Sequence, residues 1–511
     1  MGCDMSNESY LIGIDAGTTG CKTVIFTEDG KPVGMDYREY PSLFPQPGWI
    51  EQSYDDIIPP LVESCRVAIN KSQIDRKKIK GLAFSSQAPL LTMLDEEGFL
   101  MRDFVSWQDL RGALYIPQLR EAYGADKFYA ETGDPLNTNS AAPKWAWLRD
   151  NEPGNFERAR WLLSEQEYLL KLWGAEDYWT DLSSASREGM LNVDTMEWSK
   201  GVHDLVGLPL EKRAKISTTP GQVVGEISGD IALRAGLPDG VPLSIGGHDQ
   251  NCSTFGGGAV KGGDTVMVMG TFGSCYVVMD EPKRDPARKL VVKPNHGMGN
   301  WTIEAFSNTS ASAFRWFRDT FSDLETAAGL AVGIDPYEFM TRQASQSTIG
   351  ANGVTFLPYL AGAAGARQNS GARANLFGMS LSTTKADVVR AVLEGICFEM
   401  KDIINAQKAA GIDIETIRLV GGAAKSPVWS QMLADALGHP IEILANDQAG
   451  CLGAAMYAGV GVGVYDSCEE AAERAVAVSS RYEPDTTKAR EYDSAFETFV
   501  ESYEALEGKL F

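Results

Sequence analysis

A turn that could bind phosphate lies near the N-terminus, where an apolar stretch ends in Asp15. The residues after it include Gly17, Thr18 and Thr19. Glycine lets the backbone approach a phosphate closely, and threonine hydroxyls and backbone N–H groups donate hydrogen bonds to phosphate oxygens. Asp15 could hold Mg²⁺ through water, and Lys22 follows where a cation can contact the same phosphates. The alternative is a tight hairpin in which Asp and Thr only cap the turn.

A second turn of similar composition begins at Gly270 and Thr271 and continues with Phe-Gly-Ser. Taken alone, it favours an ordinary structural turn. Its position adds weight, because it stands in the second half of the chain where the first turn stands in the first half. A nucleotide clamped between two lobes needs a phosphate-binding hairpin from each of them.

A candidate general base, Asp249, follows the apolar residues 241–245 and a pair of glycines. A carboxylate at the end of a strand, beside glycines that clear space, is well placed to accept a proton from a hydroxyl that attacks a phosphoryl group. Gln250 comes directly after it. The alternative is that Asp249 only caps a turn, and the simplest interpretation of His248 is that it orders the loop.

Small residues stand at a predicted strand-to-helix turn, at Gly421, Gly422 and Ala423. They allow a flat purine or its ribose to lie on the backbone, although ordinary tight packing is the alternative. Neither a G-x-x-x-x-G-K-[ST] phosphate loop nor a strand-linked G-x-G-x-x-G is evident in the chain.

The elements that must hold these residues follow a similar order in both halves. In the first half, the pattern predicts strands at 10–15, 21–27 and 33–37, a helix at 54–70 and a strand at 79–84. In the second half, it predicts strands at 265–270, 275–279 and 417–420, and helices at 310–321, 385–409 and from about 427. Antiparallel strands that give way to alternating strand and helix indicate an α/β fold. The glycine run at 256–258 is the candidate boundary between the domains 1–255 and 256–511.

The composition limits the class of protein and its partners. The chain has 511 residues, of which 44% are hydrophobic and 23% charged, as in a soluble globular protein of two large domains. A formal charge of -23 disfavours DNA, RNA and anionic lipid, because these partners bind Lys- and Arg-rich surfaces. It does not disfavour ATP, whose phosphates are held by local N–H groups and a cation.

Cysteine, histidine and apolar patterns exclude further classes of protein. The eight cysteines contain no C-x-x-C and the four histidines show no metal-ligand spacing, which disfavours a disulfide framework and a zinc site. No uninterrupted run of about 18 apolar residues occurs, and the polar start of the chain lacks the regions of a signal peptide. We therefore expect a cytoplasmic protein without a membrane partner.

Taken in order, these residues resemble the FGGY carbohydrate kinase family, over about residues 10–506. The most specific match is Ala-Asn-Leu-Phe-Gly-Met at 374–379 with the acidic and apolar residues at 387–394, which is similar to the C-terminal signature of the family. The N-terminal signature is approached at 142–151, although Asn139 and Ala141 depart from its usual start.

The resemblance implies two ribonuclease-H-like lobes around a central cleft, as in actin, heat-shock ATPases and sugar kinases. The first lobe would bind the sugar and carry the catalytic aspartate, and the second would bind adenosine, with ATP and Mg²⁺ as cofactors. By this resemblance, Asp249 matches the catalytic aspartate. The nucleotide-binding positions are Asp15, Gly17, Thr18, Thr19, Gly270, Thr271, Gly421, Gly422 and Ala423.

The segments that match the sugar site depart from the better-known members. Xylulokinases carry Gln-Met-His and glycerol kinases Gln-Arg-Glu where this chain has Gln87, Ala88 and Pro89, so the polar groups expected to contact substrate hydroxyls are missing. Trp107 and Asp109 match a segment near the sugar. Asp249 followed by Gln250 is similar to glycerol kinases.

The resemblance predicts ATP-dependent phosphorylation of a hydroxyl of a small sugar or polyol, with a ketose such as a pentulose favoured. One alternative is a kinase of this family for a different acceptor. Another is a nucleotide-switched, actin-like ATPase or binding protein, because fold alone does not determine function. We expect a small-molecule partner and leave the oligomeric state open, a homodimer included.

Overall fold

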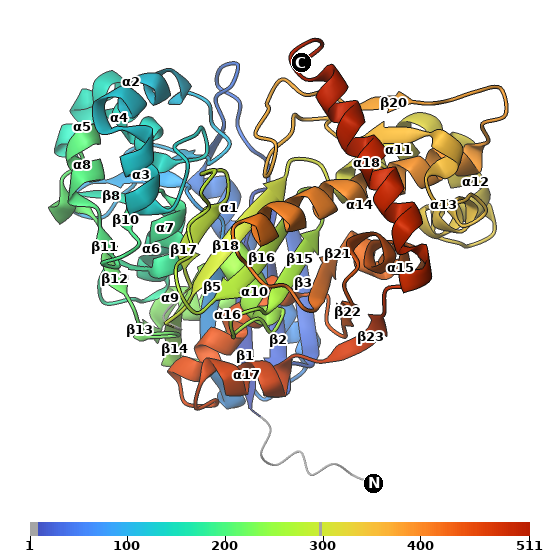
Figure 1. Cartoon of the computed structure of the whole chain (residues 1–511). Coiled ribbons are helices and arrows are strands. Elements are labelled where there is room, and N and C mark those ends of the chain that lie inside the picture. Colours follow the sequence, from blue (N-terminus) through green and yellow to red (C-terminus); the bar gives the residue numbers. More distant parts are fainter. Residues whose placement is uncertain (1–8, 296–298) are drawn as a thin grey trace, which may run out of the picture.

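The computed structural model of the chain describes residues 9–295 and 299–511 (Figure 1). The start of the chain, from which we expected no signal peptide, lies outside the described residues. Two mixed β-sheets form the centre of the molecule, and helices pack around and between them. Among the described residues, no helix is both long and apolar enough to cross a membrane.

The first sheet contains six strands in the order β13-β14-β5-β1-β2-β3. Its strands are β1 (Tyr10–Ala16), β2 (Gly20–Thr27), β3 (Pro32–Glu39), β5 (Ile79–Ser86), β13 (Val223–Ile227) and β14 (Val241–His248). β1, β2 and β3 form the predicted antiparallel meander, while β5 lies parallel to both β1 and β14. The carboxyl ends of these three parallel strands therefore meet at one edge, where Asp15 pairs with Ser85, and Gly247 pairs with Ser85 from the other side.

The second sheet contains seven strands in the order β17-β18-β16-β15-β21-β22-β23. They are β15 (Thr265–Met269), β16 (Gly273–Met279), β17 (Val291–Pro294), β18 (Trp301–Ser307), β21 (Ile417–Gly421), β22 (Ile441–Leu444) and β23 (Val478–Tyr482). β15 and β16 form an antiparallel hairpin, and β21 lies parallel to β15 with Gly421 opposite Met269. The hairpin turn and the glycine turn after β21 therefore share one edge of this sheet.

Two helices lie between the sheets, α10 (Asp249–Gly256) and α16 (Ala449–Gly461). α16 comes from the second half of the chain but packs against β1, β5 and β14 of the first sheet. Glycine permits this contact, because a Cβ added at Gly13 would lie 1.8 Å from the backbone oxygen of Cys451. The two halves therefore share one buried core around Leu11, Phe255 and Tyr457.

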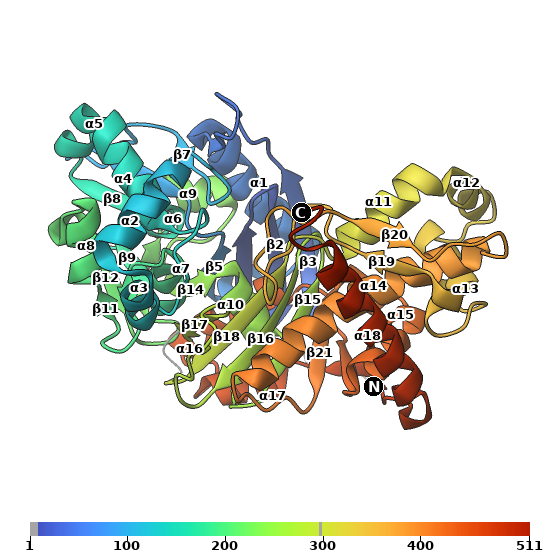
Figure 2. The ribbon, with the colours of Figure 1, turned by 45° about the horizontal axis from the view of Figure 1, so that its top comes forward.

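The remaining helices surround this centre, and Figure 2 shows most of those from the first half on one side of it and most of those from the second half on the other. On the first-half side they are α1 (Tyr54–Ser72), α2 (Ile116–Tyr123), α3 (Ala125–Thr132), α4 (Ala141–Asn151), α5 (Pro153–Arg158), α6 (Glu165–Trp173), α7 (Leu182–Arg187), α8 (Lys200–Val206) and α9 (Gly229–Ala235). In the second half they are α11 (Ala311–Phe321), α12 (Asp323–Ala331), α13 (Pro336–Ala344), α14 (Lys385–Ala409), α15 (Pro427–Leu437), α17 (Cys468–Ala475) and α18 (Ala489–Leu506).

Short strands form four further small sheets among the described residues, three in the first half and one in the second. A four-stranded sheet has the order β4-β7-β6-β8, with β4 (Glu51–Gln52), β6 (Leu91–Leu94), β7 (Phe104–Val105) and β8 (Trp161–Ser164). The other pairs are β9 (Trp179–Asp181) with β12 (Lys215–Ser217), β10 (Leu191–Asn192) with β11 (Glu197–Trp198), and, in the second half, β19 (Thr355–Leu357) with β20 (Asn375–Phe377).

Candidate active site

Two cavities adjoin at the second glycine–threonine turn, since Gly270 and Thr271 line both of them. The inner cavity, of about 270 Å³, lies between the two halves of the chain. Its lining residues are Thr18, Gln87, Ala88, Trp107, Asn139, Arg187, His248, Asp249 and Gln250 from the first half, and Val268, Gly270, Thr271, Phe272, Gly273, Ser274, Tyr276, Glu304, Phe306 and Asn308 from the second. The rings of Trp107 and Phe272 meet across it with their centroids 6.0 Å apart.

The first turn is held from several sides. Gly17 N–H donates to the carbonyl of Gly20 at 3.0 Å and closes the hairpin between β1 and β2. The carbonyl of Gly17 accepts from Tyr40 Oη at 2.5 Å, and the hydroxyl of Thr18 accepts from Trp107 Nε1 at 3.0 Å. Thr19 remains exposed. The turn is therefore rigid, with an open side toward solvent.

Asp15 lies at the end of β1, beneath this turn. Its carboxylate accepts a hydrogen bond from Ser85 Oγ at 2.5 Å. Burial raises the pKa of Asp15 to about 6; the bond from Ser85 and the charge of Lys22 oppose this increase, whereas the charge of Asp249 adds to it. Lys22 is half-buried, with its ammonium 5.8 Å from the ring centre of Tyr37. Asp15 and Asp249 are therefore close enough to repel each other.

Asp249 is the first residue of α10, and its side chain is 28% exposed. Its Oδ1 lies 2.9 Å from His248 Nε2 and accepts from the N–H of Gln250 at 2.6 Å. Burial alone would raise the pKa of Asp249, but His248 and Arg187 outweigh it, so that this pKa lies below its ordinary value. Asp249 is therefore ionised at neutral pH and accessible from the inner cavity, as a proton acceptor must be.

A buried charge cluster joins the halves at the wall of the inner cavity. Arg187 Nη1 lies 3.3 Å from Glu304 Oε2, Tyr276 Oη donates to Glu304 at 2.7 Å, and Lys293 Nζ lies 3.6 Å away. These positively charged and hydrogen-bonding partners outweigh burial and hold the pKa of Glu304 at about 2. Arg187, Asn139 and Glu304 were not predicted as site residues from the sequence. Asn139 borders the N-terminal signature, but no local pattern marks Arg187 or Glu304, which pair across 117 positions.

The residues matched to the sugar segment divide into two groups. Gln87, Ala88 and Trp107 line the inner cavity, together with Gln250. Pro89 is buried and is not among the lining residues. Asp109 is not among them either: its fully enclosed carboxylate accepts from Arg111 Nε at 2.8 Å and from the N–H of Ile50 at 2.6 Å. Asp109 therefore fastens the loop that carries Trp107.

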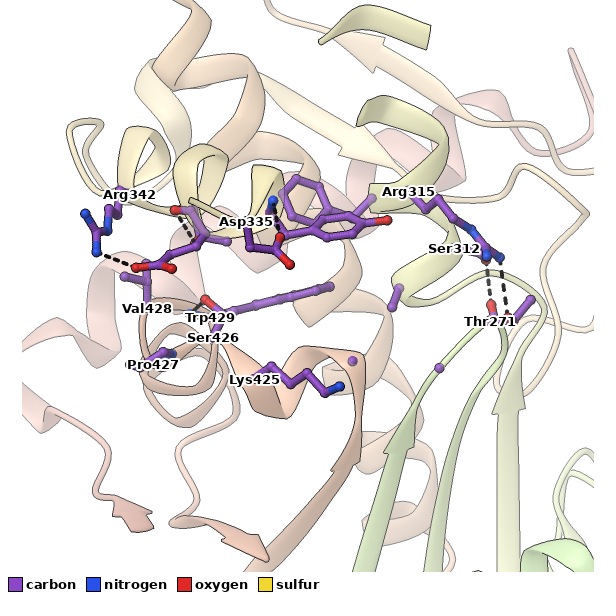
Figure 3. A pocket seen from close by; sticks show the side chains of 17 residues that line it. Thr271, Ser312, Arg315, Asp335, Arg342, Lys425, Ser426, Pro427, Val428 and Trp429 are labelled. Carbon is purple, nitrogen blue, oxygen red and sulfur yellow. Dashed lines mark hydrogen bonds and ion pairs between the residues drawn. The ribbon is translucent and has the colours of Figure 1, made fainter. Parts of the chain in front are cut away.

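The outer cavity, of about 790 Å³, lies in the second half. Its lining residues are Gly270, Thr271, Ala311, Ser312, Phe314, Arg315, Asp335, Tyr337, Glu338, Thr341, Arg342, Gly422, Lys425, Ser426, Pro427, Val428 and Trp429. Figure 3 shows Ser312 and Arg315 directed to Thr271, with Ser312 Oγ donating to its carbonyl at 2.5 Å and Arg315 Nη2 to its hydroxyl at 3.4 Å. An aromatic and polar lining of this size suits a flat heteroaromatic ring with phosphates near Thr271.

Gly421, Gly422 and Ala423, at the end of β21 and in the turn after it, lie in different surroundings. Gly421 has φ +102°, and an added Cβ would lie 2.5 Å from the carbonyl of Met269, so this position requires glycine. Gly422 is exposed to the outer cavity, and an added Cβ would meet no atom closer than 3.9 Å. Ala423 is buried in the core of the second half and is not among the lining residues.

The acidic residues present fit a magnesium ion that is bound partly through water and phosphate. Asp15 and Asp249 are close enough to repel each other, Asp249 lines the inner cavity, and a divalent cation would offset their repulsion. Within residues 9–295 and 299–511, no group of three or more His, Cys, Asp or Glu side chains could hold a metal ion without such additional ligands.

Comparisons with known proteins cover nearly the whole chain. Residues 10–256 match the model of the FGGY family of carbohydrate kinases, N-terminal domain, and residues 265–462 match that of the C-terminal domain. A gluconokinase of Bacillus subtilis (strain 168) is 27% identical over 505 residues, which are 98% of this chain and 97% of that protein. A xylulose kinase of the same strain is 27% identical over 497 residues, with 97% and 96% covered. The solved structure of a xylulose kinase from Lactobacillus acidophilus has a TM-score of 0.89 at 25% identity and covers 98% of this chain and 99% of its own.

Proposed function

Because the chain belongs to the FGGY family of carbohydrate kinases, we propose that Asp249 takes the proton of a sugar or polyol hydroxyl that attacks the γ-phosphoryl group of ATP. The chain has the two-domain α/β fold of these kinases and is a phosphotransferase with an alcohol group as acceptor. Carbohydrate kinases use ATP as phosphate donor. The family match favours this enzyme over an actin-like switch.

The observation that carries the proposal is that Asp249 lines the inner cavity, which shares Gly270 and Thr271 with the outer one. Adenosine would occupy the outer cavity, the acceptor would occupy the inner one, and the phosphates would pass the Gly270 and Thr271 turn that lines both. Gly17, Thr18 and Thr19 would bind the phosphates from the other lobe, with Lys22 nearby. Phosphoryl transfer depends mainly on such positioning and charge stabilisation.

In the proposed reaction, the acceptor oxygen forms a bond to the γ-phosphorus as the bond from that phosphorus to the β,γ-bridging oxygen breaks. Asp249 accepts the hydroxyl proton, and ADP leaves. Asp15 would hold Mg²⁺ through water, and that ion would offset phosphate charge. We assign the acceptor and Asp249 to a lobe of residues 1–255 and adenosine to a lobe of residues 256–511, with α16 returning to the first sheet.

A ketose such as a pentulose is the favoured acceptor, and a sugar acid is the second candidate. Ala88 contributes no polar side chain to the inner cavity, whereas the Arg187 guanidinium and the Asn139 amide line it. A guanidinium donates to carbonyl, hydroxyl and carboxylate oxygens, and its bond to a carboxylate is the strongest of these because both groups are charged. Relatives named xylulose kinase and gluconokinase are consistent with both acceptor classes.

We place this reaction in the cytoplasm, without a nucleic-acid or membrane partner.

The proposed function predicts ADP release that depends on the acceptor. In a screen of ketoses, sugar acids, aldoses and polyols, we expect the best ketose or sugar acid to exceed glycerol by at least about tenfold in kcat/KM. The reason is that one hydrogen bond to a charged group contributes about 1.5–3 kcal/mol, and glycerol has fewer oxygens than a pentulose or a sugar acid to place on Arg187 and Asn139. ATP hydrolysis at the same rate with every compound, or with none, would contradict the proposal.

A second prediction concerns the outer cavity. Gly422→Val has room for its Cβ but extends methyl groups into the cavity, so KM for ATP should rise about tenfold, as overpacking costs roughly 1–3 kcal/mol. KM for the acceptor should stay within about twofold of wild type. Steady-state kinetics with each substrate varied in turn make the measurement.

Gly421→Ala is the matched control, because its Cβ meets the carbonyl of Met269 and its φ is unfavourable for alanine. It should lower the unfolding temperature. If Gly422→Val instead changes only the acceptor KM, adenosine binds elsewhere.

A further inference from the structure

An enclosed carboxyl group lies beneath the first phosphate turn and has no role in the reaction described above. Glu165 is the first residue of α6 and is 0% exposed. Both of its oxygens are buried without a hydrogen bond of good geometry among the described residues. It is not the cap of its helix, because Ser164 and Glu167 form the capping box, in which the Ser164 N–H donates to Glu167 at 2.6 Å. Its burial therefore needs another explanation.

The side chain of Glu165 lies against that of Gln87. Gln87 Nε2 donates to the carbonyl of Gly17 at 3.1 Å and to Gln52 Oε1 at 2.9 Å. Gln52 Nε2 in turn donates to the carbonyl of Thr18 at 2.8 Å. The amide of Gln87 therefore holds the backbone of the phosphate turn directly and through Gln52.

A count of donors indicates the protonation state of Glu165. An amide nitrogen carries two hydrogens, and Gln87 uses both of them on Gly17 and Gln52, so none remains for a carboxylate. Gln87 Oε1 is itself buried, and no described residue donates to it. A neutral carboxylic acid has one O–H group, and Gln87 Oε1, in the side chain that Glu165 contacts, is an acceptor without a donor among the described residues. If Glu165 were ionised, its buried negative charge and the buried Gln87 Oε1 would both lack a hydrogen-bond donor among the described residues.

The groups that face Glu165 from the neighbouring elements also oppose ionisation. They are the carboxyls of Asp15 on β1 and Asp249 on α10, the phenol of Tyr40 and the thiol of Cys21 on β2. Among these described groups there is no cation. Burial, followed by the charges of Asp15 and Asp249, raises the pKa of Glu165 well above its ordinary value, although the contact with Gln87 opposes this.

We propose that Glu165 is a positioning residue that works as a neutral carboxylic acid and fixes the Gln87 amide, and through it the phosphate turn at Gly17 and Thr18. The proposal rests on the proposed function only for the statement that this turn binds the nucleotide. An acid kept neutral at this point supplies a hydrogen bond without adding a third negative charge beside Asp15 and Asp249.

Substitutions separate a neutral acid from an ionised one. Glu165→Gln keeps the size, the neutral state and a donor, so kcat/KM for ATP should stay within about threefold of wild type. Glu165→Ala removes the donor and leaves a void, so kcat/KM for ATP should fall at least about tenfold, mainly through KM. Glu399→Gln is the matched control, because Glu399 on α14 is also enclosed, with a pKa raised to about 8 by burial, but lines neither cavity. It should leave KM for ATP unchanged.

A direct measurement of protonation completes the test. The infrared difference spectrum of wild type minus Glu165→Gln, with isotope-labelled glutamate, should contain the carbonyl band of a protonated carboxyl at neutral pH. A carboxylate band in its place, or a Glu165→Gln variant as impaired as Glu165→Ala, would overturn the proposal. The infrared comparison decides even if Glu165→Ala does not fold. The infrared result does not depend on the proposed function. The proposed function would fail separately, if no acceptor increased ADP release by the wild-type enzyme.

Discussion

Asp249→Asn will lower kcat for acceptor phosphorylation by about 10²–10⁴-fold, the contribution of a positioned general base. Asparagine keeps the size of the side chain and a hydrogen-bonding oxygen but cannot take the hydroxyl proton. Asp249 is suited to this role, because His248 and Arg187 keep its carboxylate ionised while its side chain remains accessible. Acceptor-dependent ADP release at saturating ATP measures the effect.

Nucleotide affinity provides the internal control for Asp249→Asn. The proposed phosphate contacts come from other residues, the two glycine–threonine turns, so the dissociation constant for ADP should stay within about threefold of wild type. Asp204→Asn is the matched surface variant, because Asp204 is 64% exposed on α8 and pairs only with Lys200 among the described ion pairs. It should retain full turnover. If Asp249→Asn keeps more than about a tenth of wild-type kcat, the base lies elsewhere.

Asp15→Asn should lower kcat/KM for ATP about 10–100-fold and raise the Mg²⁺ concentration needed for half-maximal rate by a similar factor. This is the usual cost of removing a group that holds a metal through an intermediate ligand. The Mg²⁺ requirement should also depend on pH. In the free enzyme the pKa of Asp15 is about 6, so its carboxylate is present above pH 6 and is lost as the pH falls through that value. Mg²⁺ titrations of the initial rate at pH 7.5 and pH 5.5 would measure both effects.

Asp15→Asn and Asp249→Asn should differ in how their rates respond to Mg²⁺. Asp15→Asn should respond to added Mg²⁺, whereas Asp249→Asn should not, because no cation concentration restores a missing base. An Asp15→Asn variant with wild-type Mg²⁺ dependence would show that Asp15 only caps the turn, through its bond from Ser85.

Much of the fold could be predicted because its signals are local. Alternating or continuous apolar runs bounded by Gly, Thr and Asp predicted β1, β2 and β5, and the parallel pairing of β1, β5 and β14 then brings Asp15 near Asp249. The long helix α14 was predicted at Lys385–Ala409, the bounds that it has in the structure. Here local propensity and tertiary packing favour the same elements.

The parts that could not be predicted depend on contacts between distant segments. The return of α16 to the first sheet needs Gly13 against Cys451, and neither residue signals the other. Arg187 meets Glu304 because α7 packs against β17, the strand that pairs with β18, at the wall of the inner cavity. Glutamate is usually a charged, exposed residue, yet Glu165 is fully buried and its side chain contacts Gln87. Its neighbours, rather than its residue type, determine its chemistry.

The role of Asp249 can be measured in a single-turnover experiment with enzyme in excess over ATP, in which mass spectrometry detects the phosphorylated acceptor for wild type and Asp249→Asn. We predict that wild type converts the γ-phosphoryl group into phosphorylated sugar, and that Asp249→Asn binds the same amount of nucleotide but forms this product at least about 10²-fold more slowly. Equal rates for the two proteins, or wild-type conversion of ATP to inorganic phosphate with no phosphorylated acceptor, would contradict the account.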